Sequence, residues 1–138
     1  MAANFKDALK LRRTYYALSN KSLIGDQEIE DIISHVLLHT PSPFNSQSTR
    51  IVLLLGENHK KLWQKTKDAL KKIVPAESFA ATESKIEGAF ASGYGSVLFF
   101  EDQSVVKGLQ DAFPSYADNF PVWSQHTSGM HQLGVWTL

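Results

Sequence analysis

The arginine side chains of this sequence are the first candidates for binding chemistry, because they are confined to two short polar segments. Arg12 and Arg13 are adjacent, and the only other arginine, Arg50, closes the polar segment 41–50. A guanidinium is a rigid, permanently charged fork that suits phosphate, whereas lysine mostly serves as solvated surface. The pattern therefore favours an anion site. The alternative is that Arg12 and Arg13 complement the dipole at the C-terminal end of a helix.

The second polar segment also carries side chains that could bind a planar heteroaromatic ring. Asn45 and Gln47 each have a carboxamide that donates and accepts hydrogen bonds, and Ser42 adds a small hydroxyl. The edge of an isoalloxazine ring needs this alternation of donors and acceptors. The alternative is a plain connecting loop, because Pro, Ser and Asn are typical of loops. On these residues alone, the loop is the simpler interpretation.

Hydrophobic periodicity places both polar segments next to helices and strands. Asn4 is a typical N-cap, and the helix that follows it ends at the arginine pair. Asp26 is the predicted N-cap of the next helix, and Pro41 stops that helix. The apolar run 51–55 predicts a strand buried on both faces. Further along we predict helices at 58–74, 79–90 and 103–113, a second buried strand at 96–100, and a last helix at 121–138.

The last predicted helix has apolar residues on more than one face. Its tryptophan, methionine, leucine and valine side chains favour a helix that is buried all round or shared with a partner. No capping residue or terminator follows it. We therefore expect a single domain, residues 1–138, that lacks the C-terminal part of a longer protein. The alternative is a helix that frays at a natural end.

The composition indicates a globular domain of the cytoplasm. The 138 residues are 43% hydrophobic and 11% aromatic, which is enough for a real core. The formal net charge is zero, which argues against a general nucleic-acid-binding protein. The chain has no cysteine, its N-terminus is too polar for a signal peptide, and no apolar run is long enough to span a membrane. We therefore expect a cytoplasmic protein without nucleic-acid or membrane partners.

Histidine and carboxylate patterns give no further site. His35 and His39 are spaced i, i+4, which can bind a metal, but no acidic or cysteine ligand accompanies them in a recognisable motif. We predict no metal site, and interpret the two residues as a histidine pair near a helix C-terminus. No Ser–His–Asp or paired-carboxylate arrangement can be argued.

Taken together, the two polar segments resemble the FMN-dependent nitroreductase family. The resemblance rests on Arg-Arg-Thr-x-Tyr at 12–16, after an N-terminal helix, and on Pro-Ser-x-x-Asn-x-Gln at 41–47, before a buried strand. Two later runs, 93–102 and 120–126, look like the compact subgroup that is found in fungi and bacteria and associated with stress responses. The resemblance covers essentially the whole chain.

The resemblance implies an intertwined homodimer with two FMN sites at the interface. The first motif would hold the phosphate and ribityl side of FMN, and the second would reach the ring from the partner. Thr14 stands where the family usually has serine. Tyr16 stands where the main branch has a cation that stabilises reduced flavin, so redox tuning is expected to differ here. The implied cofactor-binding residues are Arg12, Arg13, Thr14, Tyr16, Ser42, Phe44, Asn45 and Gln47.

The resemblance also implies a fold and an activity. The fold is α+β, with a central, mostly antiparallel sheet flanked by helices. The activity is that of an oxidoreductase with FMN, which takes hydride from NADH or NADPH and reduces nitroaromatics, quinones or related acceptors by a ping-pong mechanism. An association with oxidative stress is expected from the subgroup. The alternative from another class is a non-catalytic flavin-binding protein that acts as a regulatory or stress-response partner.

Overall fold

The computed structural model describes residues 4–138, and its packing divides them into two compact units. The first unit contains residues 4–12, Ile24–Val52 and Leu98–Leu138, and the second contains Arg13–Leu23 and Leu53–Val97. The elements are six α-helices, two strands, and three short helical turns, within the part of the chain that is described. The predicted α+β class is therefore confirmed.

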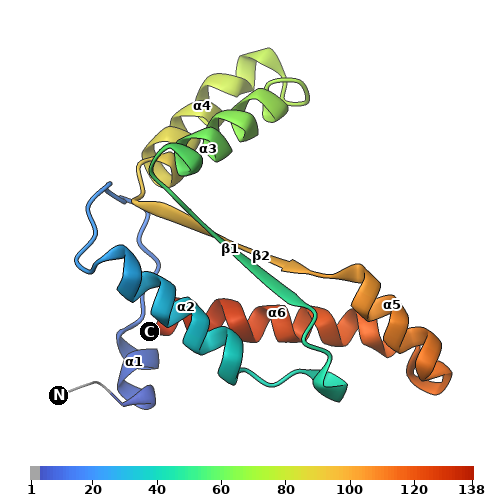
Figure 1. Ribbon diagram of the computed structural model, residues 1–138. Helices are drawn as coiled ribbons and strands as arrows, with labels where there is room; N and C mark the ends of the chain where they lie inside the picture. The colour runs from blue at the N-terminus through green and yellow to red at the C-terminus, as the bar shows by residue number, and fades with distance from the viewer. Residues whose placement is uncertain (1–3) are drawn as a thin grey trace. The chain divides into compact units, whose positions relative to one another are not determined.

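The first unit is built around the long helix α6, Asn119–Thr137. Helix α2 (Asp26–His39), helix α5 (Gln103–Ala112) and the 3-10 turn η1 (Pro43–Asn45) all pack against it (Figure 1). The buried apolar side chains here are Ile33, Val36, Val106 and Phe120. At Gly134 a Cβ atom would lie 2.7 Å from Val36 Cγ1, so the missing side chain lets α2 and α6 approach closely.

Of the two N-caps predicted in this unit, one is confirmed and the other is shifted by one residue. Helix α1 is Phe5–Leu11, and Asn4 caps it as predicted, with its Oδ1 accepting the Asp7 N–H at 3.0 Å. The predicted N-cap Asp26 is wrong by one residue, because Gly25 is the cap and Asp26 begins α2. An acidic residue in the first turn still stabilises the helix through its dipole.

The sheet consists of two antiparallel strands, β1 (Thr49–Leu55) and β2 (Gly95–Glu101). Gly95 meets the end of β1 closely, since a Cβ there would lie 2.5 Å from Leu55 Cδ2 and 2.9 Å from the Leu54 carbonyl oxygen. The prediction of a second buried strand is wrong, because no residue of β2 is buried and Phe100 is 52% exposed. The prediction of burial on both faces is also wrong for β1. Val52 is 40% exposed, because alternate residues of a strand face opposite sides and one side is open within residues 4–138.

The second unit is a helical pair, α3 (Gly56–Leu70) and α4 (Ala76–Ile86), which continues into a π-helical turn, η2 (Glu87–Ala91). The predicted helix 79–90 therefore begins earlier and ends in a wider turn. The buried His59 of α3 contacts the end of η2. Its Nε2 lies 3.1 Å from the Ala91 carbonyl oxygen, and its Nδ1 lies 3.0 Å from Ser96 Oγ. A carbonyl only accepts, so Nε2 carries the proton and Ser96 donates to Nδ1.

None of the helices formed by residues 4–138 combines the length and apolar character that a membrane crossing requires.

Candidate functional site

The loop that carries Ser42, Asn45 and Gln47 has an unusual backbone. Phe44, Asn45 and Gln47 have φ angles of 54°, 51° and 49°, in the left-handed region that residues other than glycine rarely adopt. The backbone is held by hydrogen bonds from the Asn45 N–H to the Ser42 carbonyl (3.0 Å) and from the Gln47 N–H to Ser42 Oγ (3.1 Å). The segment is therefore a shaped turn rather than a plain connecting loop.

The side chain of Phe44 anchors this turn in a group of aromatic rings from the same unit. Its ring centroid lies 4.9 Å from Phe113, 5.2 Å from Phe120, 5.6 Å from Tyr116 and 6.0 Å from Trp123. Tilted, edge-on and stacked pairs at these distances are favourable beyond the area they bury. The aromatic cluster, defined as these five residues, thus offsets the strained backbone of the turn.

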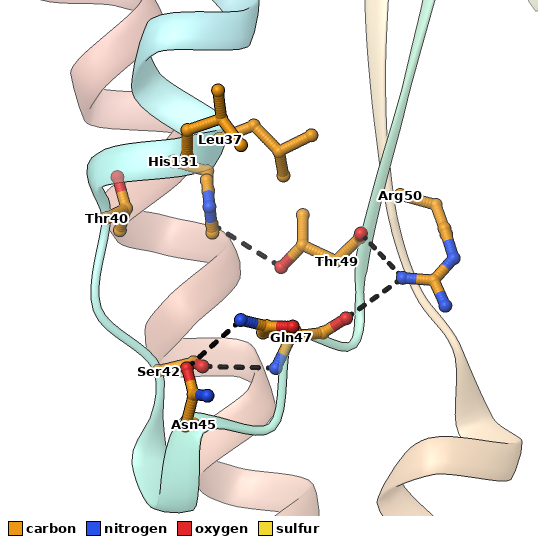
Figure 2. A pocket seen from close by; sticks show the side chains of 9 residues that line it. Leu37, Thr40, Ser42, Asn45, Gln47, Thr49, Arg50 and His131 are labelled. Carbon is orange, nitrogen blue, oxygen red and sulfur yellow. Dashed lines mark hydrogen bonds between the residues drawn. The ribbon is translucent and has the colours of Figure 1, made fainter.

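A pocket of about 270 Å³ opens beside the turn (Figure 2). Aliphatic and hydroxyl side chains at the end of α2 form one side, and polar side chains of the turn and the start of β1 form the other. An apolar wall that faces a few placed polar groups is typical of a small-molecule site. The lining residues are Leu37, Leu38, Thr40, Ser42, Asn45, Gln47, Thr49, Arg50 and His131.

The two carboxamides of the turn fix each other. Gln47 Nε2 donates to Asn45 Oδ1 at 3.2 Å, as Figure 2 shows. This bond uses one donor and one acceptor of the pair. It leaves the Asn45 amide group as a donor and the side-chain oxygen Oε1 of Gln47 as an acceptor, in two residues that line the pocket. A planar ring with an adjacent acceptor and donor on its edge fits such a pair.

A carboxylate behind the pocket holds the start of β1. The hydroxyls of Ser48 and Thr49 both donate to Glu101, and the Thr49 bond to Oε1 measures 2.7 Å. Ser48 and Thr49 are 0% and 6% exposed, so these bonds are shielded from water. Thr49 Oγ1 also lies 3.4 Å from His131 Nδ1. The pocket wall is therefore tied to β2 on one side and to α6 on the other.

Arg50 lines the pocket and is held by hydrogen bonds and an ion pair. Its Nη1 donates to the carbonyl oxygens of Gln47 and Thr49, each at 3.0 Å, and its Nη2 pairs with Asp102 Oδ2 at 3.1 Å. Asp102 also accepts from the Ser104 hydroxyl and N–H, and these bonds, with a smaller contribution from Arg50, hold its pKa below the usual value. These contacts make Arg50 a brace for the turn.

The structure brings part of the expected cofactor set together. Ser42, Asn45 and Gln47 line the pocket, and Phe44 lies in the aromatic cluster behind them. Arg12 belongs to the same unit but follows α1, where its guanidinium lies 4.0 Å above the ring of Trp136. The other expected residues, Arg13, Thr14 and Tyr16, belong to the second unit and are exposed.

Several lining residues were missed by sequence reasoning. Leu37, Leu38, Thr40 and Thr49 flank the polar segment, and nothing in their types distinguishes them from ordinary helix and strand residues. His131 did carry a signal, because the buried residues Phe120, Ser124, Thr127 and His131 follow one helical face. A polar stripe on a helix of mixed polarity indicates a face that meets other polar groups.

The described residues form an α+β fold with a pocket beside the turn after α2. The comparisons give the family: residues 9–135 match the Nitroreductase family, to which the chain belongs. Putative nitroreductase HBN1 and nitroreductase FRM2 of Saccharomyces cerevisiae are 36% and 34% identical to it. Each of these alignments covers 97% of this chain and 67% of the relative.

A solved structure agrees with this assignment. Nitroreductase CinD from Lactococcus lactis, in complex with chloramphenicol, superposes with a TM-score of 0.82 at 40% identity, covering 97% of this chain and 67% of CinD. The structure of CinD with 4-nitrophenol gives the same TM-score and identity, with 66% of CinD covered. The chain spans about two-thirds of the length of these relatives. The expected nitroreductase fold is thereby confirmed.

Proposed function

We propose that this protein is an FMN-dependent nitroreductase that takes hydride from NADH or NADPH and reduces nitroaromatics, quinones or related acceptors by a ping-pong mechanism. The observation that carries the proposal is the pocket beside the turn, in which Ser42, Asn45 and Gln47 converge opposite an apolar wall. It is supported by membership of a family whose members generally bind flavin. CinD, with chloramphenicol and 4-nitrophenol, is a relative crystallised with nitroaromatic ligands.

The side chains present fit one edge of a flavin ring. The Asn45 amide group donates and the Gln47 carbonyl accepts, which suits the alternating carbonyl and N–H groups of the pyrimidine edge. Arg12 and Arg13 are proposed to bind the phosphate with charge-assisted hydrogen bonds. Thr14 and Tyr16 are proposed to lie along the cofactor. When bound, FMN supplies the hydride-transfer chemistry, and the protein orients it and excludes water.

We also propose that the protein acts as a homodimer and that each site is shared. Helix α6 presents a second face, opposite the polar stripe, on which Val122, Met130, Leu133 and Trp136 are between 42% and 53% exposed. Large apolar side chains gathered on one exposed face are typical of an interface. A second copy of the chain would cover them, and the 41–47 turn would then reach the flavin that the partner's arginine motif holds.

Flavin binding and turnover test the proposal separately. The purified protein is titrated with FMN, and binding is followed by quenching of flavin fluorescence. Oxidation of NADH and of NADPH is then measured with 4-nitrophenol and with a quinone, and a ping-pong mechanism predicts parallel double-reciprocal lines. Absence of FMN binding at 0.1 mM would overturn the proposal. Binding without reoxidation of dithionite-reduced flavin by any acceptor would instead support a non-catalytic flavin-binding protein.

A further inference from the structure

His131 is a buried histidine in the wall of the pocket. It is 3% exposed and lies on the polar stripe of α6, across the pocket from the turn that carries Ser42 and Gln47 (Figure 2). No hydrogen bond or ion pair joins its ring to a Lys, Arg or carboxylate group within residues 4–138, and Thr49 stands between it and Glu101. The donor and acceptor roles of its two ring nitrogens can therefore be decided from their nearest hydrogen-bonding neighbours.

The proton of a neutral His131 ring is on Nδ1. This atom lies 2.9 Å from the Thr127 carbonyl oxygen and 3.4 Å from Thr49 Oγ1. A carbonyl can only accept, and the Thr49 hydroxyl already gives its proton to Glu101. Both neighbours of Nδ1 are thus acceptors, and Nδ1–H donates to them. In the neutral ring, Nε2 is then left as a hydrogen-bond acceptor.

Nε2 has no hydrogen-bond partner among residues 4–138, although it is buried. Leaving a buried acceptor without a donor is unfavourable by more than an ordinary hydrogen bond contributes. The ring cannot turn over to satisfy it, because the turned ring would move Nδ1 away from the Thr127 carbonyl. A donor could come from water or from a molecule bound in the pocket that this side chain lines.

We propose that His131 is a ligand-binding residue whose Nε2 accepts a hydrogen bond from an N–H or O–H group of the molecule bound in the pocket. The inference rests on the proposed function, in which that molecule is FMN. Oxidised FMN has donors of two kinds, the ring N3–H and the ribityl hydroxyls. His131 thus adds an acceptor from α6 to the polar groups that the 41–47 turn supplies.

Two substitutions separate this role from a purely structural one. In His131→Asn the shorter amide reproduces Nδ1 and keeps the bond to the Thr127 carbonyl, but no atom occupies the position of Nε2. In His131→Gln the longer amide places an acceptor near that position. His35→Asn is the matched control, because His35 is an exposed histidine on α2 that does not line the pocket. Thermal unfolding without ligand establishes that each variant is folded.

The dissociation constant of FMN is measured for each protein by fluorescence quenching. We expect His131→Asn to weaken binding about 3- to 10-fold, the effect of losing one hydrogen bond, and His131→Gln to restore most of it. His35→Asn should bind like the unsubstituted protein. Lumiflavin, which has the ring N3–H but no ribityl chain, locates the donor: weakening of both ligands assigns it to the ring, and weakening of FMN alone assigns it to the chain.

A measurement on the unsubstituted protein covers the case in which a variant does not fold. Long-range ¹H–¹⁵N NMR of histidine-labelled protein reports whether each ring nitrogen accepts a hydrogen bond. Addition of FMN should shift the His131 Nε2 resonance and leave that of His35 in place. FMN binding with no such shift, or with equal affinity in His131→Asn, would overturn this inference alone. Failure of the unsubstituted protein to bind FMN would overturn the proposed function, and the inference with it.

Discussion

Phe44 and Trp123 stack with their ring planes 19° apart and their centroids 6.0 Å apart, so a residue with a left-handed backbone is held by a side chain of α6. The contact joins the turn after α2 to the helix that forms the floor of the first unit. Because the turn also carries Asn45 and Gln47, the geometry of the pocket depends on a ring that does not line it.

Removal of the Phe44 ring should therefore destabilise the turn that carries the pocket residues Asn45 and Gln47. We expect Phe44→Ala to lower the free energy of unfolding by about 1–3 kcal/mol, since it loses four aromatic contacts and keeps an unfavourable φ angle. FMN affinity should fall with it. Phe5→Ala is the control, because Phe5 is 69% exposed in α1 and should change the stability little. Chemical denaturation measures the free energy of unfolding of both variants. If Phe44→Ala is as stable as the unsubstituted protein, the aromatic cluster does not hold the turn.

Gly95 should be intolerant of a methyl group. An added Cβ would lie 2.9 Å from the Leu54 carbonyl oxygen, which is backbone and cannot move aside easily. We expect Gly95→Ala to destabilise the protein by about 1–3 kcal/mol through overpacking. Gly108→Ala is the matched control, because a Cβ there meets nothing within 4 Å in α5. It should stabilise the helix by about 0.5–1 kcal/mol. A Gly95→Ala protein as stable as its parent would contradict the packing at this end of the sheet.

Asp102 should contribute to the dependence of stability on pH. The Ser104 hydroxyl and N–H, and less strongly Arg50, favour the charged carboxylate and lower its pKa from the usual 3.8. A carboxyl whose pKa is lower in the folded state stabilises the protein above its ordinary pKa, and loses this effect as the pH falls through the lowered value. Ser104→Ala should raise the pKa of Asp102, measured by NMR titration of the carboxyl carbon. An unchanged pKa in that variant would contradict the assigned cause.

A shared site predicts complementation between two inactive dimers. One carries Arg12→Ala and Arg13→Ala, and the other carries Asn45→Ala and Gln47→Ala. After refolding together with FMN, about half of the dimers are mixed, and in each of these one site has both defects and the other has neither. About a quarter of all sites should then be active, by turnover of an acceptor. Confirmed mixed dimers without recovered activity would exclude a site built from two chains.

Features that depend on interactions between residues close in the sequence could be predicted, and features without a local signal could not. Helix α1 and the stop of α2 could be predicted, because a cap or a proline acts within a turn of the chain. The polar segment 41–47 could be recognised as a candidate site by the side chains it carries. The positive φ angles of Phe44 and Gln47 could not be predicted, because glycine and asparagine are the residues that usually signal that conformation.

The second wall of the pocket depends on contacts between distant parts of the chain. His131 lies 82 positions from Thr49, and only the packing of α6 brings it there. Its bond to Thr127 is local, but its contact with the Thr49 hydroxyl, which in turn donates to Glu101 of the other strand, has no short-range signature. The role of Arg50 has the same origin, since Asp102 reaches it from the end of β2.

The left-handed backbone of the turn has a consequence for how the sequence can diverge. Asparagine and glycine tolerate this conformation, whereas β-branched residues are strongly disfavoured in it. Selection for a folded protein alone would therefore retain Asn45, and an aromatic residue at position 44, in a descendant that no longer bound any ligand. Position 47 is left-handed as well, with a φ of 49°, so a loss of binding in the lineage would become visible there as replacement of glutamine by asparagine or glycine.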